Sequence, residues 1–158
     1  MDERTRLYAN FAARFAVDGL HGPAQPCDPA ELDRAEAALG TYLPASYRQF
    51  LATHGPLFVP DLWDAVTERK PEVHAAREFL TPDQVVSDTR LYWSGGMPKD
   101  FIGVAGDAMG NLFGFPRVAI AGARPDDLPV RLFDHDYVRV DPVAASFDGW
   151  LRWFIENA

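Results

Sequence analysis

The chain has 158 residues, of which 47% are hydrophobic and 13% are aromatic. This length and composition are those of one folded domain, and they exclude a chain that is disordered through low hydrophobicity. The formal net charge of -8 excludes a surface that generally attracts phosphate backbones or anionic lipids, so we expect neither nucleic acid nor membrane as a partner.

Cysteine usage and the start of the chain bear on the compartment. Cys27 is the single cysteine, so no disulfide can form within the chain. The opening residues Met1 to Arg4 include two acids, and no long apolar run follows them, which argues against a secretory signal. No stretch approaches the roughly 18 apolar residues that a membrane span needs. These features predict a soluble, cytoplasmic protein.

The N-terminal segment is expected to be a helix and a connector. Residues 2–16 place Leu7, Phe11 and Phe15 on one side of a helix, and this apolar stripe needs a partner surface. Glycines and prolines then punctuate the chain up to residue 27. We therefore divide the chain into residues 1–27, a helix and connector that could be an appendage, and a domain over residues 28–158.

Two further helices follow as a hairpin. Asp28 and Glu31 form a capping box at the start of the second helix, with proline in its first turn, and Gly40 is its expected end. The third helix is predicted from Pro44 to Gly55. Residues 57–80 are left open between strand and short helix.

The second half of the chain predicts strands between two helices. Thr81 and Gln84 form another capping box. The apolar runs 101–105 and 112–115 predict one β-hairpin, and the runs 130–133 and 137–140 predict a second. Ser146 is expected to cap a last helix with a broad apolar face. The predicted fold class is α+β, with a helical hairpin packed on a mostly antiparallel sheet and a C-terminal helix.

Three motifs invite a catalytic or metal interpretation, and each is weighed against a structural one. The Asp107–Asn111 loop has one carboxylate where a calcium loop needs several, so we predict a hairpin turn. Asp134, His135 and Asp136 could act in acid–base chemistry, but a polar turn is the favoured interpretation. Ser46 and Ser146 lie outside any nucleophile elbow and are predicted to have helix-surface and capping roles. The histidine spacing matches no zinc motif, so we predict no metal and no cofactor.

Several short segments, in their order along the chain, resemble the SUKH superfamily of Smi/Knr-type proteins. They are Glu36 to Gly40 with Leu43-Pro44, the helix that carries Tyr47, Phe50, Leu51 and Gly55, the stretch from Ile102 to Asn111, and Ala145-Ser146-Phe147. The resemblance covers residues 30–158. It implies a helical hairpin on a sheet, a binding surface formed by sheet and loops, and one of two functions without catalysis. The first is neutralisation of a cognate toxin, and the second is a regulatory protein–protein interaction module.

The sequence departs from the family pattern at two places. Residues 57–80 are longer and more charged than the family leads us to expect, and Asn111 stands where family members often carry aspartate. Both departures concern the partner more than the fold.

Acids and aromatic residues supply the expected partner-binding surface. An acidic surface steers towards a basic partner, such as a nuclease toxin, and tryptophan supplies buried contact area. The acidic charge is also ordinary for a soluble cytosolic protein, and the aromatic residues can equally belong to the core or its rim. The predicted partner-binding residues are Asp61, Trp63, Asp64, Glu68, Trp93, Asp107, Asp134 and Asp136.

Overall fold

The structure is a computed structural model, and it describes the whole chain, residues 1–158. The helices are α1 (Glu3–Phe15), α2 (Pro29–Leu39), α3 (Ala45–His54), α4 (Leu62–Thr67), α5 (Pro82–Ser94) and α6 (Phe147–Asn157). The strands are β1 (Glu78–Phe79), β2 (Phe101–Gly106), β3 (Leu112–Pro116), β4 (Val130–Asp134) and β5 (Arg139–Ala144). The α+β class predicted from the sequence is confirmed.

The strands form one antiparallel sheet in sequence order, β1-β2-β3-β4-β5. The two predicted hairpins are present as the pairs β2–β3 and β4–β5. Gly114 of β3 lies opposite Gly103 of β2, and a side chain at Gly114 would collide with the carbonyl group of Ile102. Glycine at position 114 therefore allows these two strands to approach each other.

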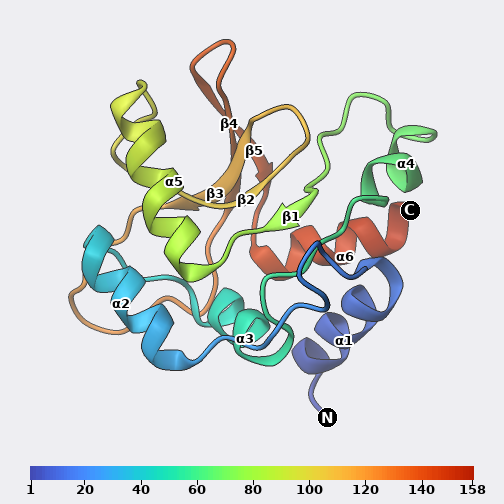
Figure 1. Cartoon of the computed structure of the whole chain (residues 1–158), viewed down its shortest axis with the longest axis horizontal. Helices are drawn as coiled ribbons and strands as arrows, with labels where there is room; N and C mark the ends of the chain where they lie inside the picture. Colours follow the sequence, from blue (N-terminus) through green and yellow to red (C-terminus); the bar gives the residue numbers. More distant parts are fainter.

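Helices cover the two faces of the sheet unequally (Figure 1). On one face lies α5, where the hydroxyl of Thr89 accepts a hydrogen bond from the backbone N–H of Gly103 at 3.1 Å. The other face carries α6, whose Trp150 ring centroid is 4.9 Å from that of Phe113. Helices α1 and α3 pack against α6, and α2 lies beside α5.

An aromatic core fills the space between the sheet and the helices α1, α3 and α6. Phe147 is fully buried at its centre, with its ring centroid 5.4 Å from that of Phe50 and 6.0 Å from that of Phe115. Helix α1 contributes Phe11, which packs against Phe50 and Phe79. The buried residues of α1, all members of this core, are Leu7, Tyr8, Phe11 and Phe15.

Three helices begin at the caps that the sequence predicted. Asp28 and Thr81 each form a complete capping box, at the starts of α2 and α5 respectively. The hydroxyl of Ser146 accepts a hydrogen bond from the backbone N–H of Gly149 at 3.0 Å, which caps α6. Side-chain oxygens placed this way satisfy N–H groups that have no partner inside the helix.

The predicted strand 137–140 is wrong in its position. Strand β5 begins at Arg139, and Tyr137 and Val138 remain in the preceding turn with 75% and 56% of their surface exposed. One carboxylate oxygen of Asp134 accepts hydrogen bonds from the backbone N–H groups of Asp136 and Tyr137, which prolongs the turn. Val138 has a φ of 49°, a left-handed conformation that interrupts the extended strand geometry.

The segment that the sequence left open, residues 57–80, contains α4 and β1. Phe58 bridges two distant parts of the chain, because it pairs with Val17 of the connector and with Glu78 of β1. The connector is thereby attached to the edge of the sheet.

Candidate functional site

One end of the sheet carries most of the residues predicted to bind a partner. There the β2–β3 turn (residues 107–111) contacts the β4–β5 turn (residues 134–138), because the side-chain oxygen of Asn111 accepts a hydrogen bond from the backbone N–H of His135 at 3.1 Å. Helix α4 lies beside the first turn, since Trp63 and Met109 line the same cavity. We call residues 61–68, 107–111 and 134–138 the tip surface; Figure 1 shows the two turns and α4 around this end of the molecule.

A chain of hydrogen bonds fixes the two turns against each other. One carboxylate oxygen of Asp107 accepts hydrogen bonds from the backbone N–H groups of Met109 and Asn111, and the other accepts from the Asn111 side chain at 2.9 Å. The side-chain oxygen of Asn111 in turn lies 2.9 Å from Nδ1 of His135. Tyr92 of α5 adds a further tie, because its hydroxyl donates to the Gly110 carbonyl at 2.7 Å. The tip surface is therefore organised before any partner binds.

The predicted acids of the tip surface fall into two groups. The carboxylates of Asp107 and Asp134 are engaged in hydrogen bonds inside their own turns, and the Asp107 side chain is only 2% exposed. Asp136, by contrast, has 72% of its side chain exposed. The other exposed acids are Asp61, Asp64 and Glu68, all on or next to α4. The exposed acids are available to a partner, whereas Asp107 stabilises the β2–β3 turn.

Exposed apolar side chains lie among these acids. Trp63 is 42% exposed and Met109 is 65% exposed, and together with Ala75 and Ala76 they line a cavity of about 270 Å³. Tyr137 and Val138 are exposed apolar residues of the second turn. The sequence prediction included Trp63 but missed Met109, Tyr137 and Val138. Tyr137 and Val138 were missed because the sequence analysis placed them in a strand. Met109 could have been found, because a methionine in a polar turn is a sign of an exposed apolar side chain.

Trp93 does not belong to the tip surface. Its indole N–H donates to the carbonyl of Phe101 at 2.9 Å, at the far end of β2 from Asp107. Lys99 and Arg117 both lie 5.2 Å from its ring centroid. The structure thus separates Trp93 from the acids with which the sequence grouped it.

In the structure, Asp134, His135 and Asp136 belong to a polar turn, which was the favoured interpretation of this motif. Nδ1 of His135 faces the Asn111 amide oxygen, and Nε2 lies 3.3 Å from a carboxylate oxygen of Asp136. None of these contacts involves a serine, threonine or cysteine that could act as a nucleophile. The structure contains no group of three or more His, Cys, Asp or Glu side chains placed to hold a metal ion.

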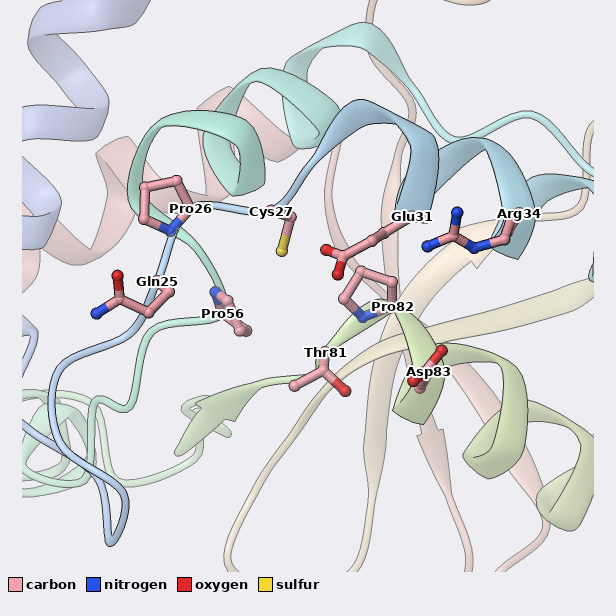
Figure 2. A pocket seen from close by; sticks show the side chains of 9 residues that line it. All are labelled: Gln25, Pro26, Cys27, Glu31, Arg34, Pro56, Thr81, Pro82 and Asp83. Atoms are coloured by element: carbon pink, nitrogen blue, oxygen red, sulfur yellow. The ribbon is translucent and has the colours of Figure 1, made fainter.

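A second hollow, of about 430 Å³, lies between the beginnings of α2 and α5 (Figure 2). Figure 2 shows the Cys27 side chain between Pro26 and Glu31 in this hollow. Burial raises the pKa of the Cys27 thiol to about 11, so the thiol stays protonated and unreactive at neutral pH. Glu31 and Thr81 already serve the caps of their helices. The hollow therefore offers few side chains that are free to react or to bind a ligand.

The fold and the tip surface define a class: an α+β protein with a helical hairpin, an antiparallel sheet and two hairpin turns that present a surface suited to protein contact. The chain belongs to the SMI1 / KNR4 family (SUKH-1), whose family model matches residues 26–153. No curated protein matches the chain. None of its helices combines the length and the apolar composition needed to cross a membrane.

Proposed function

We propose that this protein is an immunity protein that binds a cognate toxin through the tip surface and blocks its active site or substrate path. The proposal rests on family membership and on one structural observation, the fixed pair of turns that presents exposed acids beside exposed apolar side chains. Apolar anchors surrounded by charged residues are typical of protein interfaces. In this proposal the protein acts in the cytoplasm, by binding and without catalysis.

Charge directs the choice of partner. The chain has a net charge of -8, and Asp61, Asp64 and Asp136 are exposed on the tip surface. Such a surface attracts a basic partner over a distance and raises the association rate. A nuclease toxin, whose cleft must bind phosphate, has the matching charge.

The first experiment identifies the partner. The tagged protein is purified from its native cells, washed at low and at high salt, and its partners are identified by mass spectrometry. A stoichiometric toxin-domain polypeptide supports the proposal. Recovery of regulators alone overturns it in favour of a regulatory interaction module, the other function that family membership allows.

The proposed electrostatic attraction of the toxin predicts an effect on the rate of association. Replacement of Asp61, Asp64 and Asp136 by lysine should slow association with the toxin about tenfold at low ionic strength, because steering is lost. Association rates are measured by stopped-flow mixing at low and high salt. The matched control reverses three exposed acids elsewhere, Asp18, Asp83 and Glu156. If both triple variants slow association equally, only net charge matters and the tip surface is the wrong site.

A further inference from the structure

A second surface carries the opposite charge from the tip surface. It is centred on Trp93 of α5, a residue that the proposed toxin surface does not use, and it includes Arg90, Lys99 and Arg117. Trp93 bonds to the start of β2, whereas the β2–β3 turn of the tip surface follows the end of this strand, about 17 Å further along it. We call these four residues the Trp93 cluster.

Contacts join the four residues into one unit. Arg90 and Arg117 donate to the carbonyls of consecutive residues at the end of α2, Ala38 at 3.0 Å and Leu39 at 2.7 Å. Lys99 and Arg117 lie at equal distances, 5.2 Å, from the centroid of the Trp93 ring. Two cations therefore lie against one half-buried aromatic ring, and Arg90 is joined to them through the end of α2.

Their positive charge exceeds what the fold needs. The C-terminus of a helix has a partial charge of about -0.5, and Arg90 and Arg117 both lie on the end of α2. One carboxylate, Asp100, lines the adjacent hollow. Three cations against one carboxylate and this helix end leave a local excess of positive charge of about 1.5.

The free donors of the cluster have space in front of them. Arg117 and Lys99 line an open hollow of about 470 Å³ together with Gly40, Asp100 and Ala119. Each guanidinium has several N–H donors, and the α2 carbonyls occupy only one donor nitrogen on Arg90 and one on Arg117. Arginine donors in this arrangement suit planar, bidentate carboxylates.

We propose that the Trp93 cluster is a second docking site, which binds a short acidic segment of a protein partner. The excess charge belongs to the Trp93 cluster, two of whose cations line the hollow, while the chain as a whole carries a net charge of -8. An extended polyanion would meet repulsion beyond the hollow, whereas a few carboxylates fit within it. This site is independent of the toxin-binding proposal, because it uses none of the tip residues.

The test uses a capped tri-glutamate peptide and the full-length ¹⁵N-labelled protein at low ionic strength. The indole N–H resonance of Trp93 is assigned with the variant Trp93→Phe. We expect a saturable shift of this resonance with tri-glutamate and none with a tri-lysine peptide. No shift with tri-glutamate overturns the proposal, as does stronger binding of pyrophosphate or of a short oligonucleotide at the same resonance.

A matched pair of variants locates the site. Lys99 and Lys70 are both exposed lysines, and Lys70 lies after α4, outside the Trp93 cluster. Lys99→Glu should weaken tri-glutamate binding at least tenfold, and Lys70→Glu should change it less than twofold. Equal weakening in the two variants would show a general charge effect and overturn the site. The variant Arg90→Gln, which keeps a side-chain donor, tests whether a second position of the cluster also contributes to tri-glutamate binding.

Discussion

Glu36 shows how a single side chain joins distant parts of the fold. It is 5% exposed and accepts hydrogen bonds from the backbone N–H of Leu43 and from Arg48, both at 2.7 Å. Arg124, from the loop that precedes β4, forms an ion pair with the same carboxylate. A carboxylate buried to this extent is stable only because it is fully paired.

Replacement of Glu36 by glutamine should therefore destabilise the protein. The variant keeps the size of the side chain but removes the charge that Arg48 and Arg124 share. We expect the free energy of unfolding to fall by about 2–3 kcal/mol, measured by urea denaturation. The control is Asp33→Asn, which removes the other partner of Arg48 but at a carboxylate whose side chain is 64% exposed. Its expected cost is below about 1 kcal/mol, and a cost equal to that of Glu36→Gln would contradict the special role of the buried carboxylate.

The sequence predicted residue roles where the partners are close along the chain. The caps at Asp28, Thr81 and Ser146 use partners within three residues, so their patterns are readable. The Glu36 pairs span 12 and 88 residues, and the contact of Asn111 with His135 spans 24. No local sequence pattern encodes such pairings. The hydrogen bonds between the two turns of the tip surface could therefore be seen only in the folded structure.

At the scale of elements, α1 is the helix whose role the sequence left open. Its apolar stripe was predicted, and the structure shows the surface it packs on, which is formed by α3 and α6. Polar contacts reinforce the packing, since the Tyr8 hydroxyl donates to the Ser46 carbonyl and lies 2.5 Å from a carboxylate oxygen of Asp148. Arg4 binds that same carboxylate group at 2.8 Å.

These contacts predict that residues 28–158 do not form a stable domain alone. Truncation of one buried phenylalanine costs about 3–5 kcal/mol, and a whole domain has about 5–15 kcal/mol of stability. Removal of residues 1–27 takes away every buried side chain of α1 and should abolish cooperative thermal unfolding, monitored by circular dichroism. The point variant Phe11→Ala should lower stability by about 3–5 kcal/mol, with Ala13→Ser on the exposed side as control. A cooperative transition in the truncated chain would show that α1 is an appendage.

Of the strands predicted from the sequence, only β5 was misplaced at its start, and for a physical reason. A helix start depends on a local cap, whereas the start of β5 depends on where the turn ends. Asp134 binds two successive N–H groups and Val138 adopts a positive φ, and these features together delay the strand to Arg139. An alternating pattern over 137–140 contains no sign of either feature.

At the scale of the whole molecule, a few titrating groups set how stability depends on pH. Burial lowers the pKa of His54 below its ordinary value of 6.5. A hydrogen bond from Arg4 lowers the pKa of Asp126 below 3.8, and the backbone N–H of Thr5 does the same for Asp2. Burial of Asp88 raises its pKa, which favours the folded state as the pH falls. Among these groups, His54 has the ordinary pKa nearest to neutral.

The sign of the His54 effect follows from proton binding. Between the ordinary value of 6.5 and the lower folded pKa, the unfolded chain binds a proton at His54 and the folded chain does not. Stability must therefore decrease as the pH falls through this window. The contributions of Asp126 and Asp2 are retained there and are lost only below about pH 4, as the pH falls towards their folded pKa values.

The variant His54→Gln separates the loss of stability caused by His54 from the loss at lower pH caused by the carboxylates. Glutamine does not titrate, so the free energy of unfolding of the variant should fall less than that of the wild type between pH 7 and pH 5, measured by urea denaturation at several pH values. Below about pH 4 the two curves should fall in parallel, because the carboxylates are unchanged. His21→Gln, at an exposed position of the connector, should keep the wild-type decrease. A decrease in His54→Gln as steep as in the wild type would place the acid sensitivity in another group and show that the half-buried imidazole gains its proton without cost to the fold.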